Sequence, residues 1–324
     1  MDRIRILVVG VGRWGREHCL SIKRIPRAEL VGVMGRKPDK TLAMGAEMGV
    51  KAFTSISEAI KVTRPDAVTI VLPHGAHLQA AVEAMEKGVD VYVEKSFGAS
   101  LKDAQAMAET ARKMGVKLMA GFSQRYISSY FELARLARSE SLGRVRYVFA
   151  KRQTPHGFIE GHWTADPTLA GGGALAGWGT HDVDLALYIV GSEPRLVYAQ
   201  MEFDDKGRET QSHILIKHDS GTISEIGIEY LAFGSDCFAW VLGEEGRVDA
   251  ERTGRLTMKR GESTETKDFP QRSFPYFLTD ALKAFVNSIL NNSEPPISAE
   301  DGIRVWKVVS AAYISARTGN SIKI

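Results

Sequence analysis

Short apolar runs alternate with amphipathic segments through the first third of the chain. Their length and their content of branched residues are typical of buried strands, which we predict over residues 3–10, 28–35, 66–72, 89–94 and 116–122. Between them, apolar residues recur at helical spacing, which predicts helices over 13–24, 38–48, 55–62, 77–88 and 101–115. Strand and helix repeated in this order indicate a doubly wound parallel sheet with helices on both faces.

The pattern changes after residue 123. A helix is predicted over 126–138, an alternating strand over 145–153, an irregular stretch over 155–170, and a glycine-rich helix start leading into 173–190. Strand patterns with short polar turns then fill 195–269, and amphipathic helices over 274–291 and 299–317 precede a short final strand. We therefore expect an α/β domain over 1–123 and an α+β domain over 124–324 with an open, mainly antiparallel sheet.

Composition narrows the functional classes. The 324 residues are 44% hydrophobic and 25% charged, as in ordinary globular proteins, and the net charge is only +3. A small, scattered positive charge favours neither nucleic acid nor a membrane surface as a partner. Two cysteines, Cys19 and Cys237, cannot build a disulfide framework, and the apolar N-terminal run is too short for a signal peptide or a membrane span. We expect a cytoplasmic protein.

A G-x-G-x-x-G motif joins the first predicted strand to the first helix. Gly10 allows the tight turn, Gly12 lets the backbone approach a pyrophosphate, and Gly15 lets helix and strand pack closely. The motif predicts a dinucleotide site that also includes Arg13 and Trp14, and the alternative is a purely structural turn. A looser match at Gly171, Gly173 and Ala176 follows no strand, so we do not interpret it as a second nucleotide site.

The end of the second strand bears on the choice of cofactor. An acidic residue about 20 positions after the motif would bind the ribose hydroxyl of NAD, but the strand ends in Met34-Gly35-Arg36-Lys37. Arg36 and Lys37 are cations suited to a 2′-phosphate, which favours NADP(H) over NAD(H). The alternative is that both are solvated charges at a strand end.

Two further residues are candidates for proton chemistry. Lys95 follows the apolar strand 89–94, at the carboxyl end of a strand where ligands bind in such sheets. His181 lies on the glycine-rich helix, and histidine changes charge near neutral pH. Taken alone, Lys95 could be a surface lysine and His181 a hydrogen-bonded structural histidine.

Several linked motifs make nearly the whole chain resemble the glucose–fructose oxidoreductase/inositol dehydrogenase/MocA-like oxidoreductases. They are GVGRWGREH, VLPHGAH, VYVEKSFGASL, GFSQRY, GGGALAGWGTHDVDLALYIVG and SAEDGIRVWKVVSAAYISARTG. The resemblance implies an N-terminal Rossmann domain and a C-terminal α/β domain whose sheet commonly carries the oligomer interface. It also implies oxidation or reduction of a hydroxyl or ketone on sugars, inositols and related polyols.

The resemblance assigns roles to individual residues. Lys95 matches the lysine of the family's E-K-P motif, which contacts substrate and takes part in proton transfer, and His181 matches the usual acid/base of its D-x-x-x-H helix. Arg125 matches an arginine near the cofactor and substrate. Asp182 and Asp184 match a continuation of the histidine motif, and we interpret them as structural.

Two positions depart from the family pattern. Ser96 replaces the proline of E-K-P, and Gly177 replaces the acid one turn before the histidine. The replacement at Gly177 leaves open a second function, a non-catalytic NAD(P)-binding regulator of the same fold. A third possibility, an amino-acid or imine reductase on a similar fold, would act only on imines or amines.

The complete prediction is an NADP(H)-dependent oxidoreductase acting on a small sugar or polyol, assembled as a homodimer or homotetramer through the C-terminal sheet. His156, His162, Trp163 and Asp166 lie in a loop suited to a sugar ring, although they could equally form a packed loop, and we expect no metal site. We expect His77 to flank the nicotinamide without a catalytic role. The predicted catalytic residues are Lys95 and His181. The predicted cofactor contacts are Gly10, Gly12, Arg13, Trp14, Gly15, Arg36, Lys37, Pro73, His74, Glu94, Lys95 and Arg125. The predicted substrate contacts are Lys95, Trp163, Trp178 and His181.

Overall fold

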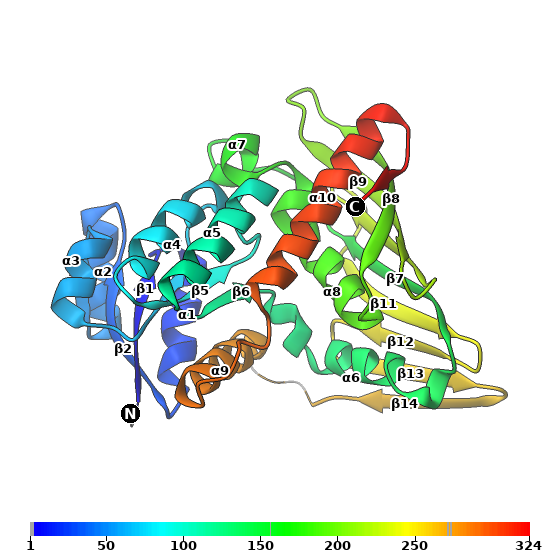
Figure 1. The fold of residues 1–324 in the computed structure, drawn as a ribbon, viewed down its shortest axis with the longest axis horizontal. Helices are drawn as coiled ribbons and strands as arrows, with labels where there is room; N and C mark the ends of the chain where they lie inside the picture. Colours follow the sequence, from blue (N-terminus) through cyan, green and yellow to red (C-terminus); the bar gives the residue numbers. More distant parts are fainter. Residues whose placement is uncertain (1–2, 156, 271, 273) are drawn as a thin grey trace. The chain divides into compact units, whose positions relative to one another are not determined.

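The computed structural model describes residues 3–155, 157–270, 272 and 274–324, so His156 lies outside the described residues (Figure 1). The chain folds into two compact units. The first comprises residues 1–123 and 273–303, and the second comprises 124–272 and 304–324. Residues 273–303, which the sequence pattern placed after the domain boundary, thus fold with the first unit.

The first unit is built on a six-stranded, wholly parallel sheet. Its strands are β1 (Ile4–Val9), β2 (Ala28–Met34), β3 (Lys51–Phe53), β4 (Ala67–Ile70), β5 (Asp90–Glu94) and β6 (Leu118–Gly121). They lie in the order β3-β2-β1-β4-β5-β6, with parallel pairing throughout. This is the doubly wound order of dinucleotide-binding sheets, in which successive strands are added to one side of β1 as far as β3 and to its other side from β4 onward. The predicted fold class of this unit is confirmed. The short edge strand β3 carried no strand pattern that the sequence could reveal.

Helices cover both faces of this sheet. They are α1 (Arg13–Lys23), α2 (Pro38–Met48), α3 (Ile56–Thr63), α4 (His77–Met85), α5 (Leu101–Met114) and α9 (Tyr276–Leu290). Helix α4 packs against α3 and α5, whereas α9 packs against α1. The Ala120 N–H donates to the Ile297 carbonyl at 3.1 Å, so the segment after α9 pairs beside β6. These long-range contacts explain why residues 273–303 belong to the first unit.

The second unit is built on a nine-stranded sheet. Its strands are β7 (Val145–Gln153), β8 (Pro194–Phe203), β9 (Glu209–His218), β10 (Ile223–Glu229), β11 (Asp236–Gly243), β12 (Arg247–Glu251), β13 (Arg255–Arg260), β14 (Ser263–Asp268) and β15 (Ile322–Lys323). Their order is β14-β13-β12-β11-β7-β10-β9-β8-β15. Every pair is antiparallel except β7 with β10, which confirms the prediction of a mainly antiparallel sheet.

Helices lie against one face of this second sheet (Figure 1). They are α6 (Ser128–Ala137), α8 (Thr180–Val190) and α10 (Ala299–Thr318), and a short helix α7 (Pro167–Ala170) precedes the glycine stretch. Helix α8 packs on β7 and β10, and α6 packs on β11 and β12. The backbone N–H of Ala199 on β8 donates to Ser315 Oγ of α10 at 2.9 Å. Helix α8 is therefore anchored over the middle of the sheet.

The opposite face of the sheet carries aromatic side chains. On β7, Val148 and Ala150 are fully buried toward the helices, whereas the alternating Tyr147 and Phe149 are only partly buried. The Tyr147 ring stacks on Trp240 with centroids 5.4 Å apart, and Phe149 lies 5.6 Å from the same indole.

Within the described residues, no helix has both the length and the apolar character needed to cross a bilayer.

Candidate active site

The turn between β1 and α1 is shaped by its three motif glycines. A Cβ atom at Gly10, where φ is +127°, would lie 2.1 Å from the Val71 carbonyl oxygen, and a Cβ at Gly15 would lie 1.9 Å from the Gly10 carbonyl oxygen. At Gly12, by contrast, a Cβ would meet no described atom within 4 Å. Gly10 and Gly15 are thus required by packing, whereas Gly12 faces open space.

Helix α1 begins at this turn, and no acidic side chain of the helix lies at its N-terminus. Gly12 is its N-cap, no side chain caps it, and its first turn contains no acidic residue. The first N–H groups of a helix have no intrahelical acceptors and attract negative charge. Open space over Gly12 and uncapped N–H groups fit the pyrophosphate of a dinucleotide. Of the other predicted contacts, Arg13 is exposed and the Trp14 ring lies 6.2 Å from that of Phe274.

The end of β2 presents cations and leaves no room for a side chain at Gly35. A Cβ there would lie 2.4 Å from Val11 Cγ2 and 2.7 Å from Thr41 Oγ1. Arg36 and Lys37 are exposed, and neither side chain makes a hydrogen bond or ion pair with the described residues. An acidic side chain at position 35 would therefore require Val11 and Thr41 to move, whereas two positive charges lie next to this position.

Lys95 follows β5 in a tightly packed loop. The Lys95–Ser96 peptide bond is cis, and Phe97 and Gly98 have positive φ values of 32° and 88°. Phe97 is fully buried against Gly302 of α10, where a Cβ would lie 2.2 Å from the Phe97 ring. The cis bond stands at the position where the sequence replaced the family proline by serine. The loop leaves the side chain of Lys95 partly exposed.

The carboxylate of Glu94 is held at the root of this loop. It lies 3.1 Å from Nε2 of His18 on α1 and accepts a hydrogen bond from the Lys95 backbone N–H at 3.2 Å. His18 is fully buried and Glu94 is 4% exposed. The pair links the glycine-turn helix to the lysine loop. Glu94 stays a predicted cofactor contact, and no sequence pattern indicated that His18 would be its partner.

Two histidines follow the end of β4. Pro73 caps a single 3₁₀ turn, His74–Ala76, and His74 is 1% exposed. The rings of His74 and His77 lie 5.6 Å apart. Because β1, β4 and β5 are neighbours in the parallel sheet, the glycine turn, Pro73 and the lysine loop come together at one edge of the first unit.

In the second unit, His181 lies at the start of α8, just after a π-helical segment, Leu175–Gly179. Wider π turns inside helices are frequent at functional sites. His181 is 7% exposed, whereas Trp178, three residues earlier, is 48% exposed. A Cβ at Gly177 would meet no described atom within 4 Å, so the residue that departs from the family pattern sits beside empty space.

The two aspartates after His181 are structural, as interpreted. Asp182 pairs with Arg152 of β7 at 2.6 Å, and Arg152 also reaches Gln124 at 3.0 Å. Asp184 accepts two hydrogen bonds from Arg125, at 2.8 and 2.5 Å. All four charged side chains are nearly inaccessible, so the pairs lock α8 to the elements around it. Arg125 is therefore bound to the helix of His181, and its predicted cofactor contact stays a prediction.

The loop before the glycines is built from local contacts. The ring of Trp163 lies 5.7 Å from that of His162, whose Nδ1 lies 2.8 Å from Thr164 Oγ1. Asp166 caps α7 by accepting from the Thr168 and Leu169 N–H groups. Trp163 is partly buried, and its predicted substrate contact stays a prediction. Lys95 belongs to the first unit, whereas Trp163, Trp178 and His181 belong to the second.

Comparison with known families decides the identity. The model of the oxidoreductase family with an NAD-binding Rossmann fold, GFO/IDH/MocA, matches residues 4–122, and the GFO/IDH/MocA C-terminal domain matches residues 130–249. The chain belongs to the GFO/IDH/MocA oxidoreductases. The resemblance noted from the motifs is confirmed, and the protein is an enzyme of a family that binds a nicotinamide cofactor.

Characterised relatives of this oxidoreductase span its full length. The myo-inositol 2-dehydrogenase of Thermotoga maritima is 26% identical over 99% of this chain and 98% of its own. The scyllo-inositol 2-dehydrogenase (NAD(+)) of Bacillus subtilis is 25% identical over 99% and 96%. Other relatives are named for NADP(+). The crystal structure of an aldose-aldose oxidoreductase from Caulobacter crescentus superposes with a TM-score of 0.90 at 24% identity, covering 99% of this chain and 100% of its own.

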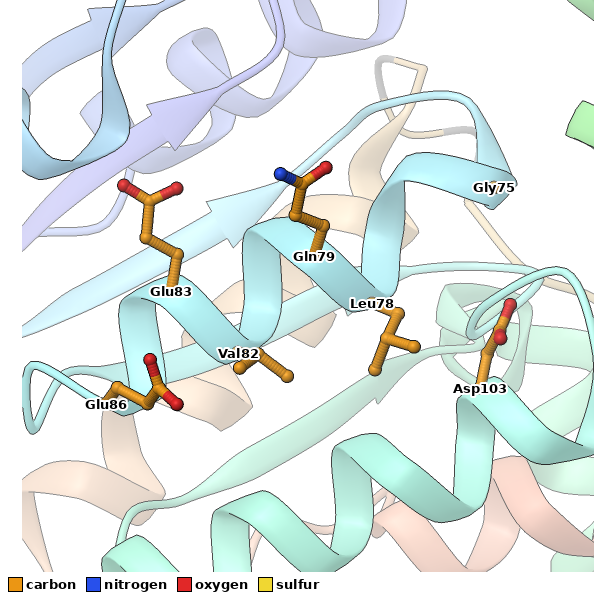
Figure 2. Close-up of a pocket in the computed structure, with 7 residues that line it drawn as sticks. All are labelled: Gly75, Leu78, Gln79, Val82, Glu83, Glu86 and Asp103. Carbon is orange, nitrogen blue, oxygen red and sulfur yellow. The ribbon is translucent and has the colours of Figure 1, made fainter.

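A depression elsewhere on the first unit contains none of the predicted site residues. It lies along α4 and the start of α5 (Figure 2), where Glu83 accepts a hydrogen bond from Ser57 Oγ and Asp103 accepts one from the backbone N–H of Ala99. The residues lining the depression are Gly75, Leu78, Gln79, Val82, Glu83, Glu86 and Asp103.

In the described part of the chain, no group of three His, Cys, Asp or Glu side chains could hold a metal ion.

Proposed function

We propose that this oxidoreductase is NADP(H)-dependent and transfers hydride between the nicotinamide and a hydroxyl or ketone carbon of a sugar, inositol or related polyol. The observation that carries the proposal is the presence of both Lys95 and His181 in a chain of this family. Lys95 follows the carboxyl end of β5, and His181 lies on a helix locked by two buried ion pairs. Relatives named for inositols support a polyol as substrate.

Lys95 and His181 are the side chains proposed to assist proton transfer. The nicotinamide supplies or accepts the hydride, so the protein must move a proton to or from the substrate oxygen. His181 acts as the base when the hydroxyl is oxidised and as the acid when the ketone is reduced. Lys95 orients that oxygen and stabilises its developing negative charge. Trp163 and Trp178 are proposed to contact the ring of the substrate.

The preference for NADP(H) rests on the end of β2. The crowded Gly35 cannot be replaced by the acid that would bind a ribose hydroxyl unless Val11 and Thr41 move. The exposed Arg36 and Lys37 lie next to it and offer charge to a 2′-phosphate. Arg13, Trp14, Pro73, His74, Glu94 and Arg125 complete the proposed cofactor contacts.

The sheet of the second unit is the proposed oligomer interface. Its open face carries Tyr147, Phe149, Phe238 and Trp240, a cluster of aromatic rings of the kind that is enriched at protein interfaces. A homodimer or homotetramer through this face would bury them. Light scattering of the wild type and of Phe149→Glu tests this, because a charge at the centre of the cluster should release smaller species. An unchanged mass for the variant would contradict the interface.

The absorbance of NADPH tests the catalytic proposal. The protein is incubated with NADP⁺ and a panel of sugars and inositols, and with NADPH and keto-sugars. Turnover should fall by about 10²–10⁴ in Lys95→Ala and His181→Ala while NADPH still binds. Near-normal turnover in both variants would remove these two roles. Tight NADPH binding without turnover of any sugar, inositol or keto-sugar would contradict the proposed substrate class.

A further inference from the structure

The glycine stretch before His181 surrounds a buried carboxylate that belongs to the protein itself. Glu209, the first residue of β9, is 1% exposed. Its carboxylate accepts hydrogen bonds from the backbone N–H groups of Gly173, at 2.7 Å and 2.8 Å to the two oxygens, Leu175 at 2.9 Å and Ala176 at 3.4 Å. These N–H groups start the helical run that leads to His181, where intrahelical acceptors are missing. Glu209 therefore caps this run from a distant strand.

The glycines are required by this carboxylate and by one hydroxyl group. A Cβ at Gly173 would lie 2.5 Å from the Glu209 backbone oxygen and 2.8 Å from its Oε2. A Cβ at Gly172, whose φ is +149°, would lie 2.0 Å from the hydroxyl of Tyr313. Any side chain at either position would displace Glu209 or Tyr313. The stretch is thus shaped to receive an internal anion, which explains why it resembles a phosphate loop without being one.

Tyr313 completes the set of donors. Its hydroxyl on α10 donates to Glu209 Oε1 at 2.8 Å. A buried carboxylate is costly unless hydrogen bonds replace its lost water. Here one hydroxyl and three backbone N–H groups do so, and the positive end of the helix adds a favourable field. Strand β9, helix α10 and the glycine stretch are therefore joined at a single carboxylate.

The joined segment leads directly to His181. The N–H of Gly177 donates to the Gly173 carbonyl at 2.9 Å, and the helical run continues through the π segment into α8. We propose that Glu209 and Tyr313 are positioning residues for His181: by fixing the first turn of its helix, they set the orientation in which the imidazole meets the substrate. This inference rests on the proposed function of His181.

Two conservative variants test the proposal. Glu209→Gln keeps the shape of the side chain but removes its charge, and Tyr313→Phe removes only the hydroxyl. Glu202→Gln, an exposed residue on the neighbouring β8, and Tyr198→Phe on the same strand are the matched controls. Hydrogen exchange of the peptide covering residues 171–180, kcat, and the Kd of NADPH are measured for each. If Glu209→Gln does not fold, the milder Tyr313→Phe carries the test.

We expect hydrogen exchange in residues 171–180 to accelerate about tenfold or more in Glu209→Gln and Tyr313→Phe, because a charged hydrogen bond is lost or weakened in each. We also expect kcat to fall about 10- to 100-fold, as for a misplaced catalytic group, with the Kd of NADPH unchanged. The controls should match the wild type. Unchanged exchange in both variants, or faster exchange with wild-type kcat, would overturn the proposal.

A second measurement tests the positioning role even if the proposed function is wrong. If the wild type turns over no polyol or keto-sugar, the imidazole NMR signals of His181 replace kcat. Signals displaced in Glu209→Gln and Tyr313→Phe but not in the controls would support the positioning role. Signals identical to those of the wild type would overturn it, independently of what the enzyme acts on.

Discussion

The backbone N–H of Gly98 donates a hydrogen bond to Nδ1 of His77 at 3.4 Å. The other ring nitrogen, Nε2, donates to the Leu72 carbonyl at 2.8 Å, and the side chain of His77 is fully buried. One ring therefore ties the end of β4 to the loop that carries Lys95. Only the neutral imidazole can do this, because a protonated Nδ1 would face the Gly98 N–H. Burial accordingly lowers the pKa of His77 to about 4.

The buried His77 predicts an acid-sensitive fold. Its pKa falls from 6.5 when unfolded to about 4 when folded, so the unfolded chain binds more protons between these values. Stability should be complete above pH 6.5 and decline as pH falls toward 4, by about 3 kcal/mol from this group. Urea unfolding across this range measures the decline. His77→Gln should flatten it, whereas the exposed His162→Gln should not, and coincident acid limbs for wild type and His77→Gln would refute the assignment.

Arg36 predicts a cofactor-selective effect. If its guanidinium binds the 2′-phosphate, Arg36→Ala should weaken NADPH binding by about 10- to 100-fold, as expected for a charged hydrogen bond, and leave NADH binding almost unchanged. Fluorescence titration with both cofactors gives the ratio. Lys40→Ala, an exposed lysine in the first turns of α2, controls for general loss of positive charge. Equal losses for NADPH and NADH in Arg36→Ala would rule out a 2′-phosphate contact.

Much of the fold could be predicted because its signals are local. The alternation of Val148 and Ala150 with Tyr147 and Phe149 identifies both the strand and its buried face. The pairing of α9 with α1 could not be predicted, because amphipathic helices do not specify which partner they cover. The three-residue strand β3 is too short to show a period.

The residues of the candidate site likewise include some that the sequence could predict and some that it could not. Gly10 and Gly15 could be predicted because a tight turn and a close helix impose their requirements within a few residues. Glu209 and Tyr313 could not, because Glu209 lies 36 residues from Gly173 and Tyr313 lies 104 residues from Glu209, and no sequence spacing indicates either contact. The cost of an unpartnered buried carboxylate explains the glycines only once the strand and helix are in place.

Because the Arg152–Asp182 pair is buried, we expect breaking it to lower the free energy of unfolding more than breaking an exposed ion pair does. Both side chains are 4% exposed, so Asp182→Ala leaves the guanidinium buried without its counter-charge. Such a loss costs about 3–5 kcal/mol, whereas Asp249→Ala, which breaks the partly exposed Arg247–Asp249 pair, should cost at most about 1 kcal/mol. Unfolding free energies measure both. The double variant Arg152→Met, Asp182→Leu should be more stable than Asp182→Ala alone. Similar costs for Asp182→Ala and Asp249→Ala would show that burial does not set the strength of the pair.

Gly177 predicts that the missing family carboxylate can be restored. Since a Cβ at Gly177 meets no described atom within 4 Å, Gly177→Asp should fold, but because the position is buried the new carboxylate should lower the stability by about 1–3 kcal/mol. Positions 177 and 181 lie on one side of the helix, so the new carboxylate would favour the charged form of the His181 imidazole. The acid limb of kcat should then move to higher pH by about one unit. Kinetics over a pH series measure the limb, and Gly177→Asn, with the same shape and no charge, is the control. If the aspartate and asparagine variants share one pH profile, the added carboxylate does not act on His181.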